Sequence, residues 1–226
     1  MKIAVLLSGS GVYDGTEIHE SVFTLLALSK NNLDFICTAP NITQHHVINH
    51  TNGEVMNEQR NSFVESARIA RGDIISLCEL DKAEISGIVI PGGFGAAKNL
   101  SNWAFEGPNG NVLQEVKDLI LHCVKNKKPI VALCISPTLI AKSLQGTIYN
   151  AKLTIGSTLG NSENNIAEIN DAISSVGVEV TNKSIKEICF DEHLKIISAP
   201  CYMMDASIND VYQNIKMSID KLSDIL

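Results

Sequence analysis

The sequence lacks three features that would each point to a class of protein. No apolar run approaches the ~20 residues that a membrane-spanning helix needs, so no membrane partner is expected. The 226 residues carry 25 acidic and 18 basic side chains, and the net charge of −7 argues against nucleic acid as a partner. None of the six cysteines stands in a C-x-x-C pair, so we expect reduced thiols and a cytoplasmic location.

Signs of a bound cofactor are also missing. Gly9, Gly11 and Gly15 miss the G-x-G-x-x-G spacing of a dinucleotide-binding loop, and Thr38-Ala39-Pro40 stands where an acidic residue would end the second strand. The histidines at positions 45, 46 and 50 have no acidic or cysteine partner at a ligand spacing, which favours a polar hairpin rim over a metal site. We therefore expect neither an organic cofactor nor a metal ion.

Strand-like and helix-like patterns alternate along the whole chain. This alternation predicts an α/β fold, a mostly parallel sheet with helices on both faces. We expect strands at residues 2–8, 33–39, 74–77, 85–90, 130–133, 153–155 and 178–180, and helices at residues 16–29, 61–69, 112–125, 137–144, 162–176 and 206–226. A small hairpin insertion turns at Asn52-Gly53, and a second hairpin joins 185–190 to 194–198. No linker or repeat interrupts the pattern, so residues 1–226 are expected to form a single domain.

The end of the apolar run 130–133 is the most informative stretch. Cys134 follows it directly, and Ser136 and Pro137 suit the N-cap and first turn of a helix. A thiol at such a strand-to-helix turn lies at the carboxyl edge of a sheet, beside backbone N–H groups and the positive end of the helix dipole. That setting lowers a thiol's pKa and favours a nucleophile. The alternative is a structural cysteine, because free cysteines are often buried.

Two further segments are expected at the same edge of the sheet. Gly92 and Gly93 directly follow the strand 85–90 and let the backbone present N–H groups to a developing oxyanion, although an ordinary glycine-rich loop is the alternative. Glu17 is either a carboxylate favoured by the dipole of its helix or a carboxyl beside the thiol that moves a proton. Cys201 follows Pro200 and approaches this edge, but the pattern assigns it no role. Loops after neighbouring parallel strands meet at this edge, which favours the functional interpretation.

Together, these segments resemble the PfpI-like superfamily, which is related to class I glutamine amidotransferase domains. The nearest branch is the enhancing-lycopene-biosynthesis, or glyoxalase ElbB, branch. The resemblance covers essentially the whole chain, and the segments that carry it are Ser8 to Glu20, Val47-Ile48-Asn49-His50, Ala67 to Gly72, Pro91-Gly92-Gly93, Ala97-Lys98-Asn99-Leu100, Ala132 to Pro137, and Ser198 to Met203.

The resemblance implies a flavodoxin-like sandwich, usually assembled as a homodimer. It implies Cys134 as nucleophile and Glu17 as the acidic partner of the thiol. It also implies that the backbone N–H groups of Gly92 or Gly93 and of Ile135 hold an oxyanion. The activity implied is cofactor-free conversion of glyoxal or methylglyoxal to a hydroxy acid, or removal of early glycation adducts, with a link to isoprenoid biosynthesis. The partner expected is thus a small dicarbonyl substrate.

One departure from the superfamily pattern limits the activity that we expect. Many members have a histidine soon after the cysteine, and residues 150–158 contain none. A Cys–His–acid triad, and with it glutamine hydrolysis, is therefore not expected. The alternative function is a non-catalytic or redox-sensing protein that acts through a partner, because an acid-paired and accessible thiol is readily oxidised.

Overall fold

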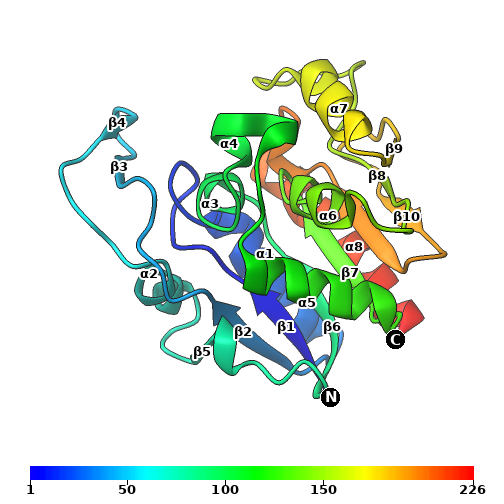
Figure 1. The fold of residues 1–226 in the computed structure, drawn as a ribbon, viewed down its shortest axis with the longest axis horizontal. Helices are drawn as coiled ribbons and strands as arrows, with labels where there is room; N and C mark the ends of the chain where they lie inside the picture. Colours follow the sequence, from blue (N-terminus) through cyan, green and yellow to red (C-terminus); the bar gives the residue numbers. More distant parts are fainter.

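The computed structural model describes all of residues 1–226 and is built around a seven-stranded sheet of order β10-β11-β7-β6-β1-β2-β5 (Figure 1). The six parallel strands are β1 (Lys2–Leu6), β2 (Phe35–Ala39), β5 (Ile74–Ser76), β6 (Ile85–Ile90), β7 (Ile130–Leu133) and β11 (Ile196–Ala199). β10 (Cys189–Asp191) pairs antiparallel with β11 at one edge. The predicted mixed α/β fold with a mostly parallel sheet is confirmed.

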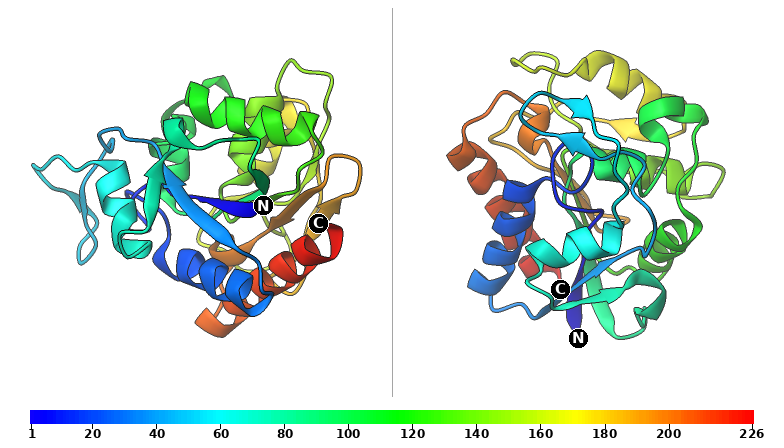
Figure 2. Two further views of the ribbon diagram at one scale, coloured as in Figure 1. Left: turned by 90° about the horizontal axis from the view of Figure 1, so that it is seen from below. Right: turned by 90° about the vertical axis from the view of Figure 1, so that its left-hand side faces the viewer.

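Helices cover both faces of the sheet. α1 (Ile18–Lys30) and α8 (Ile208–Ile225) pack together on one face, and α5 (Gln114–Lys125) and α6 (Pro137–Leu144) lie on the other (Figure 2). α2 (Ser62–Ile69) packs along β2 and β5. Because both faces are covered, the central strands are almost continuously apolar, and β7 is buried at every position. None of the helices combines the length and apolar character needed to cross a bilayer.

Smaller elements surround this sandwich. β3 (Ile48–Asn49) and β4 (Glu54–Val55) form the predicted hairpin insertion. β8 (Lys152–Leu153) and β9 (Glu179–Val180) pair in a separate parallel two-stranded sheet, and α7 (Ile166–Ser175) packs beside β9 and α6. The short helices α3 (Phe94–Lys98) and α4 (Trp103–Glu106) were not expected, because four or five residues are too few to display a helical period.

Several helices begin later than the sequence predicts, and for α1 and α7 a tertiary contact explains the shift. α1 is capped by Glu17 rather than Thr16, because the Thr16 hydroxyl instead accepts a hydrogen bond from the backbone N–H of Ser8 at 2.6 Å. α7 is capped by Asn165 rather than Ser162, whose hydroxyl donates to the carbonyl of Met203 at 2.6 Å. In both cases a tertiary contact occupies the hydroxyl that the local sequence offers as a cap.

Candidate active site

Cys134 occupies the turn between β7 and α6. Its backbone has a positive φ of 57°, a left-handed conformation that a side chain rarely adopts without support from its surroundings. The loop after β6 supplies that support, since the Ser136 hydroxyl donates to the carbonyl of Pro91 at 2.8 Å instead of capping α6. The residue is only 7% exposed and is therefore buried.

Two backbone N–H groups lie close enough to the Cys134 thiol to oppose the rise in its pKa. They belong to Gly93, in the loop after β6, and to Ile135, the next residue along the chain. Both are among the oxyanion donors that the resemblance implies. The third, the N–H of Gly92, already donates to Oε2 of Glu20 at 2.8 Å and is therefore occupied.

The carboxyl in contact with the thiol belongs to Glu20. Its side chain is fully buried, lies with the Cys134 thiol against Gly92, and accepts from the backbone N–H of Tyr202 at 3.4 Å. Glu17, which the resemblance implies for this position, caps α1 by accepting the N–H of Glu20 at 2.6 Å. The acidic partner is thus one helical turn further into α1. The signal for it in the sequence is a carboxylate in the same inward-facing row of α1 as Thr24 and Ala27.

Burial controls the charges of this pair. Burial and the charge of Glu17 together raise the pKa of Glu20 to about 8. Burial and the Glu20 charge raise the pKa of the Cys134 thiol, while the N–H groups of Gly93 and Ile135 oppose that rise. The sequence predicts a lowered thiol pKa, and that expectation fails because desolvation outweighs the helix dipole. The thiol and the carboxyl thus titrate together, and near neutral pH the pair carries at most one negative charge.

A polar cluster lies beside this pair. Nδ1 of His19 lies 2.9 Å from the Tyr202 hydroxyl and 4.0 Å from Oε1 of Glu17. The His19 side chain is about half exposed. Tyr202 belongs to the segment Ser198 to Met203 that carries the resemblance, but the sequence assigns it no role. It is brought here because it follows β11 directly and its backbone N–H meets Glu20.

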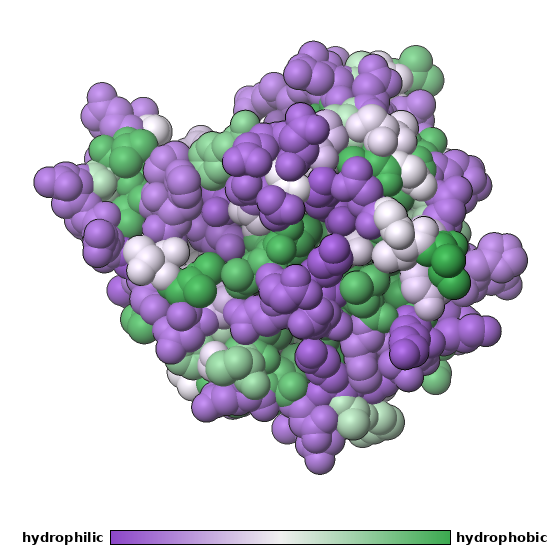
Figure 3. Space-filling model, in the orientation of Figure 1, coloured by the Kyte–Doolittle hydropathy of each residue, from purple (hydrophilic) through white to green (hydrophobic).

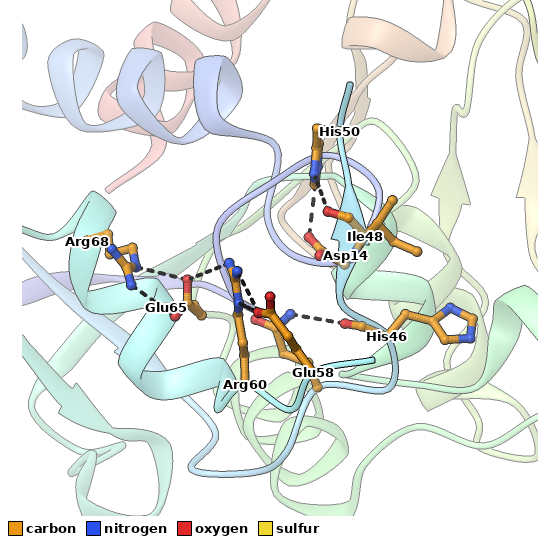
Figure 4. A network of polar contacts seen from close by, with 9 residues as sticks. Asp14, His46, Ile48, His50, Glu58, Arg60, Glu65 and Arg68 are labelled. Atoms are coloured by element: carbon orange, nitrogen blue, oxygen red, sulfur yellow. Dashed lines mark hydrogen bonds and ion pairs between the residues drawn. The ribbon is translucent and has the colours of Figure 1, made fainter. Parts of the chain in front are cut away.

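The three histidines of the hairpin insertion make separate contacts instead of gathering as ligands, and Figure 4 shows two of them, His46 and His50, apart from each other. Nδ1 of His50 lies 3.0 Å from the carbonyl of Ile48, and Nε2 accepts the backbone N–H of Tyr13 at 3.2 Å. These contacts tie the insertion to the loop after β1. His45 and His46 both stack against Phe105. No three His, Cys, Asp or Glu side chains lie together in a way that could hold a metal ion.

A chain of ion pairs closes the base of the same insertion. Arg60 pairs with Glu58 at 2.9 Å and with Glu65 at 3.8 Å, and Arg68 pairs with Glu65 at 2.9 Å. Figure 4 shows these side chains in one row between the insertion and α2. They hold the insertion in place and lie apart from the thiol.

The sheet order and the cysteine at the strand-to-helix turn define a class I glutamine amidotransferase-like domain. No family model matches the chain. The ES1 protein homolog, mitochondrial, of rat is 36% identical over 230 residues, which is 99% of this chain and 84% of the rat protein. The human glutamine amidotransferase-like class 1 domain-containing protein 3, mitochondrial, is also 36% identical, over 99% of this chain and 83% of its own. The chain therefore belongs to the ES1 family of glutamine amidotransferase-like class 1 proteins.

Solved structures agree with this assignment. An isoprenoid biosynthesis protein with an amidotransferase-like domain from Ehrlichia chaffeensis superposes with a TM-score of 0.90 at 35% identity, covering 100% of this chain and 99% of its own. Drosophila melanogaster DJ-1beta superposes with a TM-score of 0.56 at 16% identity, covering 100% of this chain and 96% of its own, and so shares the fold. The resemblance stated from the sequence is confirmed.

The expected cytoplasmic location is contradicted by these relatives. The rat, human and zebrafish proteins are all named mitochondrial. The expectation relied on reduced cysteines, inferred from the absence of a C-x-x-C spacing. Free thiols indicate a reducing surrounding and do not distinguish one reducing compartment from another.

Proposed function

We propose that this protein is a cofactor-free thiol enzyme that converts a small dicarbonyl such as glyoxal or methylglyoxal to a hydroxy acid. The observation that carries the proposal is the contact of the Cys134 thiol with the buried Glu20 carboxyl and with the N–H groups of Gly93 and Ile135. The low exposure of Cys134 favours a small free aldehyde over a glycated protein side chain as substrate. The Ehrlichia chaffeensis relative is named for isoprenoid biosynthesis, which supports a link of this chain to that process.

The first step is the addition of the thiol to an aldehyde. As Cys134 forms a bond from sulfur to the carbonyl carbon, its proton passes to Glu20 in its ionised form, which a pKa of about 8 leaves as a minor share near neutral pH. The negative charge that develops on the carbonyl oxygen is stabilised by the N–H groups of Gly93 and Ile135, which are freed as the sulfur loses its charge. Glu20 then protonates this oxygen, giving a neutral hemithioacetal.

The second step moves hydrogen from carbon to the neighbouring carbonyl. Glu20 removes the proton from the hemithioacetal carbon, giving an enediolate, and returns that proton to the adjacent carbon, while the hydroxyl proton moves from the first oxygen to the second. The product is a thioester of the hydroxy acid. Water cleaves the carbon–sulfur bond, releases the acid and restores the thiol. The net reaction adds one water to one dicarbonyl and needs no oxidant or reductant, which is why one carboxyl and one thiol suffice.

The test is glyoxal and methylglyoxal turnover by the wild type, Cys134→Ala and Glu20→Gln. Both variants are expected to lose at least about a hundredfold in kcat, the usual contribution of a positioned acid–base group. Cys78→Ala removes an exposed thiol and is the matched control, expected to keep wild-type turnover. Unchanged turnover in Cys134→Ala would overturn the proposal. Loss in Glu17→Gln alone, with Glu20→Gln active, would return the acidic role to Glu17.

The proposed assembly is a homodimer formed through α1. Ile18, Val22 and Leu26 are spaced by four residues on the outer side of this helix and are 45%, 47% and 42% exposed. Such a continuous apolar stripe is unusual on an isolated surface. The face covered by α5 and α6, by contrast, is largely hydrophilic (Figure 3). A second copy of the chain would bury the stripe against its own counterpart, as two-fold symmetry requires.

A further inference from the structure

A second thiol, that of Cys201, lies directly beside Cys134. β7 and β11 are neighbours in register, with Leu133 opposite Ala199, and the N–H of Cys134 donates to the Ala199 carbonyl at 2.9 Å. Cys201 follows two residues later, and the backbone N–H of Cys134 lies close enough to oppose the burial-driven rise in the pKa of its thiol. The register places Cys134 beside Pro200, one residue from Cys201, and neighbouring strands lie about 4.8 Å apart. A disulfide spans up to about 7 Å between Cα atoms, so the spacing of these strands is compatible with one.

The backbones of the two cysteines share an unusual conformation. Cys134 and Cys201 have φ values of 57° and 46°, and they are the only buried residues other than glycine with a positive φ. Cys201 is held in this conformation by Asn214, whose Oδ1 accepts its N–H at 3.0 Å. Such strain persists where the surroundings enforce it, and it is concentrated at functional sites. Both cysteines are therefore held by the fold in a backbone conformation that residues other than glycine usually avoid.

Glu20 connects the two loops that carry the cysteines. Oε2 accepts the N–H of Gly92 beside Cys134, and Oε1 accepts the N–H of Tyr202, the residue after Cys201. Charges on Glu20 and Cys134 act on the Cys201 thiol, which is fully buried. A single carboxyl is thus placed to receive a proton from either thiol.

We propose that Cys201 is a resolving thiol that closes a reversible disulfide with Cys134 when a peroxide oxidises the site. The Cys134 sulfur first attacks the peroxide, breaks the O–O bond and becomes a sulfenic acid, and the peroxide is reduced to water or an alcohol. The Cys201 sulfur then forms the S–S bond and displaces the sulfenic oxygen as water. Glu20 carries the Cys201 proton to that oxygen. The inference requires a reactive Cys134 and is independent of any dicarbonyl substrate.

The experiment is limiting hydrogen peroxide added to the reduced wild type, Cys201→Ala and Cys78→Ala, followed by peptide mapping without reduction. The wild type and the Cys78→Ala control are expected to lose two hydrogen masses and to yield a cross-linked peptide joining Cys134 to Cys201, which dithiothreitol separates. Cys201→Ala is expected to gain two oxygen masses at Cys134 instead, because without a resolving thiol the sulfenic acid is oxidised further.

Two outcomes would overturn the proposal. One is oxygen addition at Cys134 in the wild type with Cys201 still free, and the other is a cross-link of Cys134 to a different cysteine. The wild-type map alone decides the matter if Cys201→Ala does not fold. Glyoxal turnover of the same reduced samples separates this inference from the proposed function, since a cross-link without turnover removes only the latter.

Discussion

At the scale of single residues, the site depends on which of two glutamates faces the thiol. Glu17 and Glu20 are one turn apart on α1, and only the second is buried against Cys134. Sequence patterns identify the elbow cysteine, because a strand-to-helix turn requires particular residues next to it. They do not identify the carboxyl, because which face of a helix meets a neighbouring loop is decided by tertiary packing. The same reason explains why Tyr202 was missed.

The raised pKa of Glu20 makes the stability of the protein depend on pH. Its pKa rises from 4.5 unfolded to about 8 in the fold, so the folded state binds this proton more tightly. The stabilisation is complete below pH 4.5 and is lost as pH rises toward about 8. Glu20→Gln removes this dependence, and its stability relative to the wild type should increase over that window by several kcal/mol at most, since one pKa unit is about 1.4 kcal/mol.

The measurement is urea unfolding of both proteins across this pH range. The exposed carboxyl of Glu84 provides the control, and Glu84→Gln should follow the wild type at every pH. If the difference in unfolding free energy between Glu20→Gln and the wild type stayed constant across this pH range, the raised pKa of the buried carboxyl would be contradicted.

Gly93 is expected to tolerate no side chain. It has a φ of 96°, and a Cβ there would lie 2.4 Å from the backbone nitrogen of Glu17. Gly53 has a φ of 77° with nothing within 4 Å of an added Cβ, so Gly53→Ala carries the conformational cost alone, about 1 kcal/mol. Gly93→Ala adds a clash with backbone and should lower the unfolding midpoint clearly more than Gly53→Ala does. Equal midpoints for the two variants would show that the loop after β6 shifts easily.

At the scale of elements, helix beginnings follow the sequence where no tertiary contact competes. α8 begins at a capping box, in which the Ser207 side chain accepts the N–H of Asp210 and the Asp210 carboxylate accepts the N–H of Ser207. Thr16 and Ser162 offer similar hydroxyls, but each is engaged elsewhere in the fold. The propensity of a residue to cap a helix is thus visible in the sequence, whereas the competing partner is not.

Ser207→Ala should remove about 1 kcal/mol of stability, because the helix loses its side-chain cap. For a domain of this size, that loss lowers the melting temperature by roughly 2–4 °C. Ser175→Ala is the matched control, because it removes an exposed hydroxyl at the C-terminal end of α7. We expect it to lower the melting temperature by less. Calorimetry of the three proteins compares them directly, and equal melting temperatures for the two variants would contradict a stabilising cap.

At the scale of the whole molecule, the sequence predicts the sandwich well because its central strands are buried on both faces and are therefore almost continuously apolar. The separate pairing of β8 with β9 could not be predicted, since two-residue strands have no period and their partners are set by long-range packing. The order of the strands likewise depends on crossovers that leave no local signal.

The proposed dimer is tested by placing a charge in the α1 stripe. Val22→Glu should convert a dimer to a monomer, because a buried unpaired charge is costly at an interface. Sedimentation velocity of the wild type and this variant measures the change. Val64→Glu, on an exposed position of α2, is the control and should leave the assembly as it is. A wild type that sediments as a monomer at all concentrations would contradict the proposal.

α1 carries the thiol's carboxyl on its inner side and the apolar stripe on its outer side. Because a helix moves as a rigid rod, a dimer contact that fixes the outer side of α1 also fixes the distance between Glu20 and Cys134. Turnover per molecule should therefore fall when the protein is diluted below the concentration at which two chains separate. The rate per molecule of such an enzyme would depend on the concentration of the enzyme itself.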